Sequence, residues 1–260
     1  MVLLIISLLG FLVIKHFFYW KINNYNFDID KIEFHAHRGF KKGCPENTME
    51  SFIKAVDNGF EWIELDVISS KDGVLVCSHN FDLECETNGK GYIHKLNYNS
   101  FKSIHTGIYT FPNSKHLIPK LSDVAESLGD KIGLNIEIKF SSPFDLKTAR
   151  ALGSYLTKNP KKKVIVSSFN PIIIAYFKIF YRSIHTAFLF QNLEYYWLVN
   201  LIHPHYIHPR IDLINSKMIL DSKNHNMGIN AWTAENYPTI KHLMSLNING
   251  IISDMDVTND

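Results

Sequence analysis

Cysteine is scarce in this sequence, and neither sign of charge dominates it. Three cysteines occur in 260 residues, Cys44, Cys77 and Cys85, and no pair has the CxxC spacing of a zinc or redox site. This pattern indicates free thiols, as in a reducing compartment, rather than a disulfide framework. With 27 basic and 25 acidic residues, the formal net charge is +2, so the clustered positive charge that binds nucleic-acid phosphates is missing. We therefore expect no nucleic-acid partner.

The chain also lacks a low-complexity linker or an internal repeat that would divide it. Its length and its 46% apolar content suffice for one large domain with a full core. Beyond residue 30, segments of helical spacing alternate with short apolar runs, namely IEFHAH, WIELDV, GVLVCSH, GLNIEIKF, KVIVSSF, HTAFLF, MGINAW and NGIISD. This rhythm predicts an α/β fold over residues 30–260, a closed (β/α)8 TIM barrel, with an open doubly wound sheet as the alternative.

The longest apolar run opens the chain. In MVLLIISLLGFLVIKHFFYW no charge precedes Lys15, and the stretch up to Trp20 approaches the ~20 residues of a membrane-spanning helix. It lacks the basic start and small-residue cleavage site of a signal peptide, and a buried helix is the other alternative. We expect residues 1–21 to form a single-pass hydrophobic membrane anchor. Because the nearby lysines, Lys15, Lys21 and Lys31, come late in the run or after it, the main domain is expected to be cytoplasmic.

Two predicted strands carry charge where a parallel barrel strand is usually apolar on both faces. In WIELDV, Glu64 and Asp66 share one strand face. In LNIEIKF, Asn135, Glu137 and Lys139 also share one. Because an unpaired buried charge is costly, a cation or a polar cavity must receive these acids. Glu64, Asp66 and Glu137 suit Mg²⁺ or Ca²⁺, which prefer oxygen ligands. The alternative is a structural ion-pair cluster in which Lys139 neutralises Glu137.

Two histidines end other predicted strands. His37 ends the first run and His79 the third, so both belong on the rim with the carboxylates if the site lies at the carboxyl ends of the strands. Two imidazoles near a metal suit general acid and base catalysis near neutral pH. Arg38, together with Lys139, supplies positive charge for a phosphate. Most other histidines, including those of HPHYIHP, are expected to be structural.

These motifs together resemble a known enzyme family. The matching pieces are HRG at 37–39, PENT at 45–48, ELDV at 64–67, KDGVLVCSHN at 71–80, EIK at 137–139, SSFN at 167–170, AWT at 231–233 and NGIISD at 249–254. Single pieces are weak, but their order and combination from residue 34 to 256 are similar to the glycerophosphodiester phosphodiesterase family. That family is known for TIM-type barrels that use a divalent ion to hydrolyse glycerophosphodiesters to glycerol 3-phosphate and an alcohol.

The resemblance implies roles for the residues at the mouth of the barrel. The expected metal ligands are Glu64, Asp66 and Glu137, the acid/base pair is His37 and His79, and the phosphate binders are Arg38 and Lys139.

Three further residues are implied as supports. Glu46 falls on the acid of PENT, which would orient the first-strand residues or support the metal. Trp232 resembles an aromatic residue of the substrate wall, with a core tryptophan as the alternative. Asn80 stands where the family usually has Asp after the second histidine, which puts the orientation of His79 in question.

Other functions remain open at this point. HAH at 35–37 also fits the HxH of metal-dependent amidohydrolase barrels, but VIVSSFN offers no further histidine. Asn80 invites a barrel that binds phospholipid without cleaving it, although the histidines and carboxylates argue against a pure binding module.

The substrate is open as well. The N-terminal helix and the aromatic-rich segments at 172–181 and 188–202 suit lysophospholipase D action, which gives lysophosphatidic acid, unless those segments are outer barrel helices. The expected partners are therefore a small glycerophosphodiester or a lysophospholipid and, through the N-terminal helix, a membrane.

Overall fold

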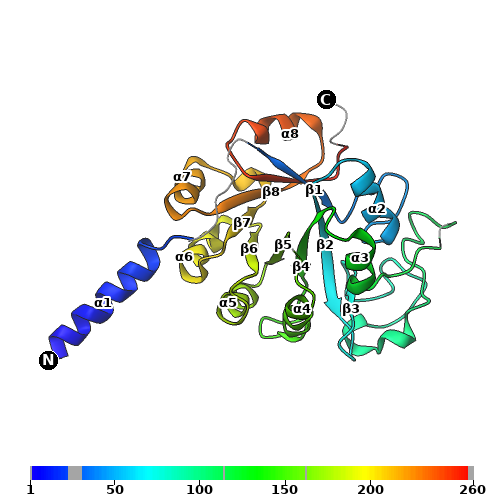
Figure 1. Cartoon of the computed structure of the whole chain (residues 1–260), viewed down its shortest axis with the longest axis horizontal. Coiled ribbons are helices and arrows are strands. Elements are labelled where there is room, and N and C mark those ends of the chain that lie inside the picture. Colours follow the sequence, from blue (N-terminus) through cyan, green and yellow to red (C-terminus); the bar gives the residue numbers. More distant parts are fainter. Residues whose placement is uncertain (1, 23–30, 114, 162, 257–260) are drawn as a thin grey trace.

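The structure is a computed structural model that describes residues 2–22, 31–113, 115–161 and 163–256. Within this part of the chain, eight parallel strands form a barrel (Figure 1). Strand β1 pairs in parallel with both β2 and β9, which closes the ring and excludes an open sheet. The predicted TIM-type barrel is confirmed. Its strands are β1 (Glu33–His37), β2 (Trp62–Ser69), β4 (Gly133–Ile138), β5 (Val164–Ser168), β6 (His185–Phe190), β7 (Tyr206–Pro209), β8 (Gly228–Ala234) and β9 (Gly250–Ser253).

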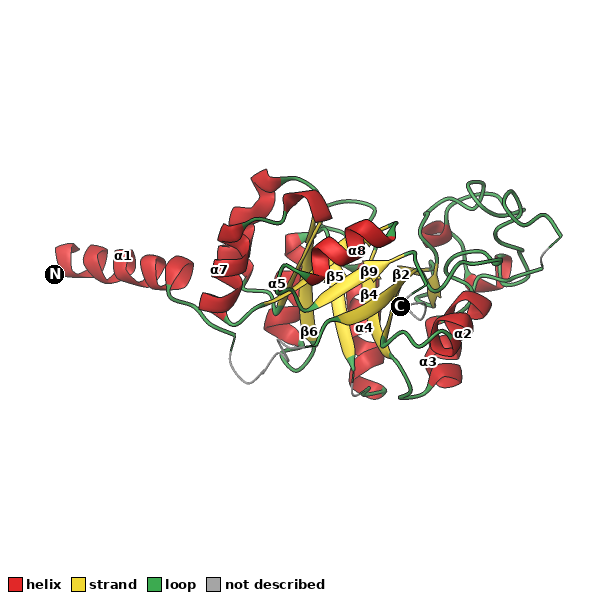
Figure 2. Ribbon diagram, turned by 90° about the horizontal axis from the view of Figure 1, so that it is seen from above, coloured by secondary structure: helices red, strands yellow, loops and turns green. Residues whose placement is uncertain are grey.

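Helices surround these strands (Figure 2) and turn apolar side chains towards them. In α5, for example, Ile173, Ile174 and Phe177 are fully buried. Most of the aromatic-rich segment 172–181 is therefore an outer barrel helix. Segment 188–202 likewise runs from the end of β6 through a 3₁₀ helix into α6. The helices are α2 (Met49–Asp57), α3 (Leu121–Leu128), α4 (Lys147–Lys158), α5 (Pro171–Phe180), α6 (Val199–Ile202), α7 (Ser216–His225) and α8 (Tyr237–Met244), with 3₁₀ helices at Leu193–Leu198 and Ile211–Leu213.

The structure corrects two expectations about the strands. GVLVCSH does not form a barrel strand, because β3 (Leu75–Cys77) pairs antiparallel with β2. The turn between Ser70 and Val74 is too short for a parallel crossover, which needs about a dozen residues. The missing barrel strand is β7, which lies within HPHYIHP. With four residues, including His208 and Pro209, β7 was too short and too polar to be predicted.

A loop-rich excursion, described over residues 78–113 and 115–118, lies between β3 and α3 beside the barrel (Figure 1). It contains two short 3₁₀ helices, Ile93–Lys95 and Tyr98–Ser100. Its apolar side chains form a small core of their own with two strand residues, made of Ile68, Val76, Leu83, Ile93, Phe101 and Ile118. The excursion thereby provides a fixed support for His79 and the residues that follow it.

The N-terminal segment forms helix α1 (Val2–Phe18), which projects away from the barrel (Figure 1). Its 17 residues span about 25 Å at the α-helical rise, less than the about 30 Å of a bilayer hydrocarbon core. None of the helices in the described part of the chain is long and apolar enough to cross a membrane, so the spanning anchor predicted for residues 1–21 is not supported. The cytoplasmic placement of the main domain stays a prediction.

The chain that follows α1 packs against the barrel. The Trp20 ring is stacked between His203 and His225, with ring centroids 4.4 Å and 4.0 Å apart. The backbone N–H of Ile22 donates to the carbonyl of His225 at 2.8 Å. These contacts attach the base of α1 to α6 and α7.

Candidate active site

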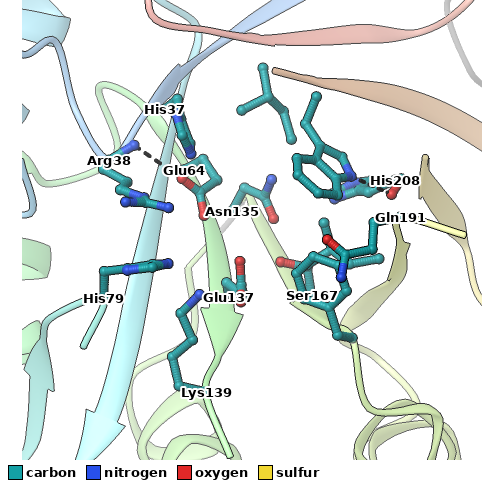
Figure 3. Close-up of a pocket in the computed structure, with 14 residues that line it drawn as sticks. His37, Arg38, Glu64, His79, Asn135, Glu137, Lys139, Ser167, Gln191 and His208 are labelled. Atoms are coloured by element: carbon teal, nitrogen blue, oxygen red, sulfur yellow. Dashed lines mark hydrogen bonds and ion pairs between the residues drawn. The ribbon is translucent and has the colours of Figure 1, made fainter. Parts of the chain in front are cut away.

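The carboxyl ends of the barrel strands surround a pocket of about 290 Å³. Seven of the ten residues predicted for the site line it (Figure 3): His37, Arg38, Glu64, His79, Glu137, Lys139 and Trp232. The other three lie one contact behind the lining. Asp66 contacts Lys139, Glu46 contacts Arg38, and Asn80 contacts His79. The remaining lining residues are neutral, namely Asn135, Ser167, Phe169, Leu189, Gln191, His208 and Ile252.

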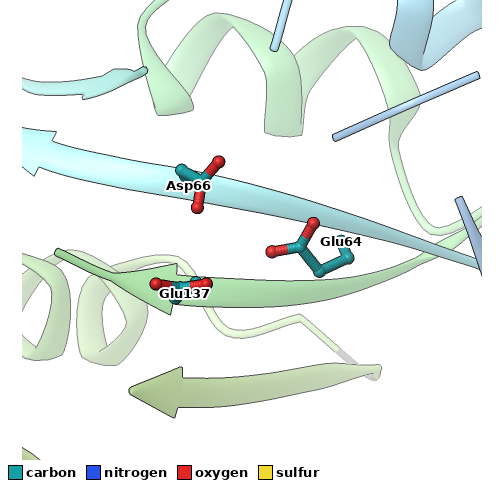
Figure 4. A group of neighbouring side chains, drawn as sticks. All are labelled: Glu64, Asp66 and Glu137. Carbon is teal, nitrogen blue, oxygen red and sulfur yellow. The ribbon is translucent and has the colours of Figure 1, made fainter. Parts of the chain in front are cut away.

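The register of β2 and β4 brings the three predicted metal ligands together. Asp66 is paired directly with Glu137, and Glu64 with Asn135, so the carboxylates point from neighbouring strands into the same space (Figure 4). One oxygen atom from each of Glu64, Asp66 and Glu137 lies within 4.8 Å of the others. All three residues are buried. This spacing allows the three carboxylates to share one cation.

Asp66 is the member of the cluster that is best neutralised. Its Oδ1 is 2.9 Å from Lys139 Nζ, and its Oδ2 is 3.3 Å from Arg38 Nε. Burial by itself would raise the pKa of Asp66, but Lys139 and Arg38 outweigh burial and hold that pKa well below its usual range. Asp66 is therefore ionised at neutral pH.

Glu64 and Glu137 show the opposite behaviour. Burial, followed by the nearby carboxylates of Asp66 and Glu137, raises the pKa of Glu64 well above its usual range. Burial also raises the pKa of Glu137, although Lys139 Nζ lies 2.6 Å from its Oε1. The predicted ion pair between Lys139 and Glu137 thus exists, but three carboxylates share the charge of two cations. The surplus of buried negative charge and the all-oxygen donor set fit a hard divalent ion.

The turn after β1 places Arg38 in the pocket. Arg38 and Gly39 both have positive φ, 57° and 80°, and a Cβ on Gly39 would lie 2.8 Å from the backbone carbonyl carbon of Ser51. Glycine is required at this position, because a side chain would both strain the turn and clash. Arg38 Nη1 then donates to Glu46 Oε1 at 2.7 Å. Glu46 thus contacts the residue that follows β1, and the two roles predicted for it stay predictions.

Asn47, in the same PENT loop, is a site residue that sequence reasoning missed. Its Nδ2 donates to Asp66 Oδ2 at 2.8 Å, and its Oδ1 accepts from the backbone N–H of Asp66 at 3.1 Å. Thr48 follows as the N-cap of α2 and accepts from Ser51 N. The loop therefore both holds Asp66 in position and starts helix α2. The conspicuous PENT run was the available signal.

Asp254 is the second residue missed. It follows β9, and its Oδ1 lies 2.8 Å from His37 Nδ1 and 2.7 Å from Lys41 Nζ. Burial opposes ionisation of Asp254, but the contacts with His37 and Lys41 prevail and lower its pKa to about 2. Because His37 Nδ1 is bound to this carboxylate, Nε2 is the ring nitrogen that can exchange a proton with a substrate. The signal was Asp254 itself, which ends the quoted run NGIISD.

His79 has a neutral partner instead. Its Nδ1 lies 3.2 Å from Asn80 Oδ1, and Asn80 Nδ2 donates to Glu86 Oε1 at 3.0 Å. Burial and then the charge of Lys139 lower the pKa of His79. The two histidines therefore differ in electrostatic surroundings although both line the same pocket.

Trp232 is one of the apolar residues of the pocket lining, with Phe169, Leu189 and Ile252. The indole packs edge to face on Phe169, with ring centroids 5.5 Å apart, and Trp232 Nε1 donates to the carbonyl of His208 at 2.7 Å. The side chain is only partly buried and lines the pocket, and its role at a substrate wall stays a prediction.

Several uncharged polar side chains in the pocket lining are fully buried. The side-chain N and O of Asn135, the Oγ of Ser167 and the Nδ1 of His208 are buried without a hydrogen-bond partner. Asn230 Nδ2 lies 3.1 Å from His208 Nε2. His208 was expected to be purely structural, and the structure instead places it in the lining of the pocket.

The buried state of His208 predicts an acid-sensitive stability. Burial lowers its pKa to about 3, against about 6.5 in an unfolded chain. Its contribution to stability is thus fully present above about pH 6.5 and is lost as the pH falls towards about 3. We expect His208→Asn to make the loss of stability below about pH 6.5 less steep. Urea unfolding midpoints measured across this range test the prediction, with exposed His242→Asn as the control. Equal slopes in wild type and His208→Asn would contradict it.

A closed parallel barrel that gathers acids, two histidines and two cationic side chains at the carboxyl end of its strands has the architecture of a TIM-barrel enzyme. Residues 37–256 match the model of the glycerophosphoryl diester phosphodiesterase family, and the chain belongs to this family.

Known proteins agree with this assignment. A glycerophosphodiester phosphodiesterase of Caldanaerobacter subterraneus subsp. tengcongensis is 31% identical over 227 residues, which cover 84% of this chain and 92% of that protein. A solved glycerophosphodiester phosphodiesterase of Thermotoga maritima has a TM-score of 0.69 at 25% identity and covers 86% of this chain and 95% of its own. A phosphodiesterase of Oleispira antarctica, solved with the product sn-glycerol-3-phosphate, shares the fold with a TM-score of 0.79 at 24% identity, covering 86% and 93% of the two chains.

Proposed function

We propose that this glycerophosphodiester phosphodiesterase depends on a divalent metal ion and uses His37 and His79 as its acid and base. The observation that carries the proposal is the position of both histidines in one pocket with a buried, incompletely neutralised carboxylate cluster. The substrates are small glycerophosphodiesters, and the products are glycerol 3-phosphate and an alcohol.

Glu64, Asp66 and Glu137 would hold the ion, Mg²⁺ or Ca²⁺. When bound, it would supply stabilisation of the negative charge that develops on the phosphate oxygens. The raised pKa values of Glu64 and Glu137 support this role, because a cation would relieve the cost of ionising both groups.

Arg38 and Lys139 bind the phosphate. Each is held from behind by carboxylates. Arg38 contacts Glu46 and Asp66 at 2.7 Å and 3.3 Å, and Lys139 contacts Asp66 and Glu137 at 2.9 Å and 2.6 Å. Their orientation is therefore set before the substrate arrives, which lowers the entropic cost of positioning the phosphate.

The histidines transfer the protons. One takes a proton from the attacking oxygen, and the other gives a proton to the leaving alcohol. Nε2 of His37 and of His79 is the nitrogen for this step, since Nδ1 of each ring has a side-chain partner. The attacking oxygen belongs either to water or to a hydroxyl of the substrate, and a cyclic phosphate in ³¹P NMR spectra of the reaction would identify the hydroxyl route.

The pocket supports a small substrate. It is about 290 Å³ in volume and joins charged, neutral polar and apolar surfaces. The glycerol 3-phosphate bound to the Oleispira antarctica phosphodiesterase supports a glycerol end here as well. The segments that had suggested a lysophospholipid, 172–181 and 188–202, instead run mostly through outer elements of the barrel.

The test uses the full-length protein, stripped of metal and supplied with Mg²⁺, Ca²⁺ or EDTA. Choline release is measured from glycerophosphocholine and from lysophosphatidylcholine, and glycerol 3-phosphate release from diesters with other head groups. Metal-dependent release of glycerol 3-phosphate that His37→Ala abolishes is the expected result. Release from lysophosphatidylcholine alone would replace the proposed substrate, and no release from any diester by the folded protein would refute the proposal.

Replacing Asp254 by Asn should lower kcat by roughly tenfold or more. The carboxylate holds His37 through Nδ1 and favours its protonated form during the reaction, and a neutral amide does this less well. KM should change little, because Asp254 does not line the pocket. Steady-state kinetics on glycerophosphocholine over a range of concentrations separates the effect on kcat from the effect on KM. An unchanged kcat would show that Asp254 has no influence on His37.

A further inference from the structure

Asn80 and Glu86 lie behind His79 and have no part in the reaction as described above. The Asn80 side chain lies between the side chains of His79 and Glu86. Its Oδ1 is 3.2 Å from His79 Nδ1, and its Nδ2 donates to Glu86 Oε1 at 3.0 Å. All three residues are partly buried. They form a line of polar contacts that runs from the pocket into the loop-rich excursion.

Hydrogen bonds to their backbone carbonyls hold Glu86 and Asn80 in place. Glu86 is anchored because its carbonyl accepts from the backbone N–H groups of Gly107 and Ile108, at 2.7 Å and 3.2 Å. The carbonyl of Asn80 accepts from Ser78 Oγ at 3.0 Å. The backbone of both residues is therefore held in place, and the partly buried Glu86 side chain reaches Asn80 from this fixed backbone.

The carboxylate decides which way the Asn80 amide points. Asn80 Nδ2 donates to Glu86 Oε1, so the NH₂ group of Asn80 faces Glu86 and the amide oxygen faces His79. An amide oxygen only accepts hydrogen bonds. His79 must therefore carry its proton on Nδ1, which leaves the lone pair of Nε2 for the reaction.

The same geometry accounts for asparagine at position 80. An aspartate there would place a second carboxylate in contact with Glu86, and two like charges at this distance repel each other. Asparagine avoids the repulsion and still presents an oxygen to His79. The departure from the family pattern is thus matched by a carboxylate six residues further on.

We propose that Asn80 and Glu86 are positioning residues that together hold His79 in the tautomer with the proton on Nδ1. The asparagine is then a working part of the catalytic site rather than a sign of a silenced barrel. This inference rests on the proposed role of His79 as an acid/base group, but its structural content can be measured without turnover.

The first measurement is ¹⁵N NMR of the full-length protein labelled at histidine, with His79→Ala used to assign the signals. Wild type should show a protonated Nδ1 and an unprotonated Nε2 for neutral His79. Glu86→Ala removes the acceptor of the Asn80 NH₂ group, so the Asn80 amide can rotate. The His79 signals should then move towards those of the tautomer with the proton on Nε2. Glu84→Ala, which alters an exposed acid of the same loop, should leave them unchanged. His79 signals that Glu86→Ala does not move would overturn the proposal.

The second measurement is a double-mutant cycle in kcat. Glu86→Ala should lower kcat by about tenfold or more, because the freed amide can point its NH₂ group at His79, and a misplaced tautomer cannot exchange the proton. Asn80→Asp should lower kcat by a similar factor, because repulsion from Glu86 moves the new carboxylate away from His79. In Asn80→Asp/Glu86→Gln, a carboxylate next to His79 and an amide behind it recreate the pair in reverse order. This variant should recover most of the activity lost in Asn80→Asp, and no recovery would count against the pair. If wild type shows the Nδ1–H tautomer but no hydrolysis, the proposed function fails while the positioning stands. Hydrolysis by a wild type whose His79 lacks the Nδ1–H tautomer would overturn only this inference.

Discussion

His37→Ala and His79→Ala should each lower kcat by about 10²- to 10⁴-fold while the protein stays folded. Each substitution removes one of the two pocket histidines that are proposed to move a proton. Because the two act in one reaction, the double variant should be little worse than the poorer single variant. Steady-state kinetics on glycerophosphocholine, with circular dichroism to verify folding, provides the measurement.

A matched control and an altered leaving group sharpen this test. His242→Ala, on the exposed side of α8, should leave kcat unchanged. A substrate with a p-nitrophenyl leaving group needs no proton at departure, so it should restore activity to the variant that lacks the acid but not to the one that lacks the base. Near wild-type kcat in both single variants would rule out the assignment of His37 and His79.

Glu64→Gln and Glu137→Gln should abolish most metal-dependent activity, with a loss of about 10²-fold or more. Both side chains would hold the ion, and an amide oxygen is a weaker ligand than a carboxylate. The same two substitutions should increase, rather than decrease, the stability of the metal-free protein. Without metal, the free energy of unfolding at neutral pH should rise, because one of three crowded carboxylates has been removed.

The pH dependence follows from the sign of the pKa shifts. Burial raises the pKa of Glu64 and Glu137 above their unfolded value of about 4.3. The stability of the metal-free protein is therefore highest, with respect to these groups, below about pH 4.3, and it is lost as the pH rises through the raised folded-state values. A bound divalent ion should counteract this loss, so its effect on Tm should grow with pH.

Thermal unfolding from about pH 5 to 8, with EDTA or with Mg²⁺ or Ca²⁺, measures both effects. Glu126→Gln, an exposed acid on α3, is the control and should behave as wild type. Two results together would show that Glu64, Asp66 and Glu137 do not form a metal site. Glu64→Gln would be less stable than wild type in EDTA, and added metal would raise its Tm as much as that of wild type.

Several parts of the fold were out of reach of sequence reasoning, each for a physical reason. The hairpin of β2 and β3 was not recognised because an apolar run looks the same in a barrel strand and in an antiparallel partner. Strand β7 was overlooked because its four residues owe their β structure to pairing with β6 and β8 rather than to their own pattern.

The same contrast holds for the site. Glu64, Asp66 and Glu137 were identifiable because strand periodicity is local, and charge on a buried strand face is expensive enough to need a purpose. Asp254 and Glu86 were missed because their roles depend on what lies opposite them. Asp254 meets His37 across 217 positions of the chain, and Glu86 acts through the side chain of Asn80.

The sequence by itself determined the repeated βα units, the strand faces that carry acids, and the motifs that identify the family, because these are properties of short segments and their order. Only the tertiary structure decided how the barrel closes, how near to one another the three carboxylates lie, and which side chain contacts Nδ1 of each histidine. Those features arise from register and packing between segments far apart in the chain. The length and exposure of α1 were also decided in space, since an apolar run shows where a helix can form but not where it ends.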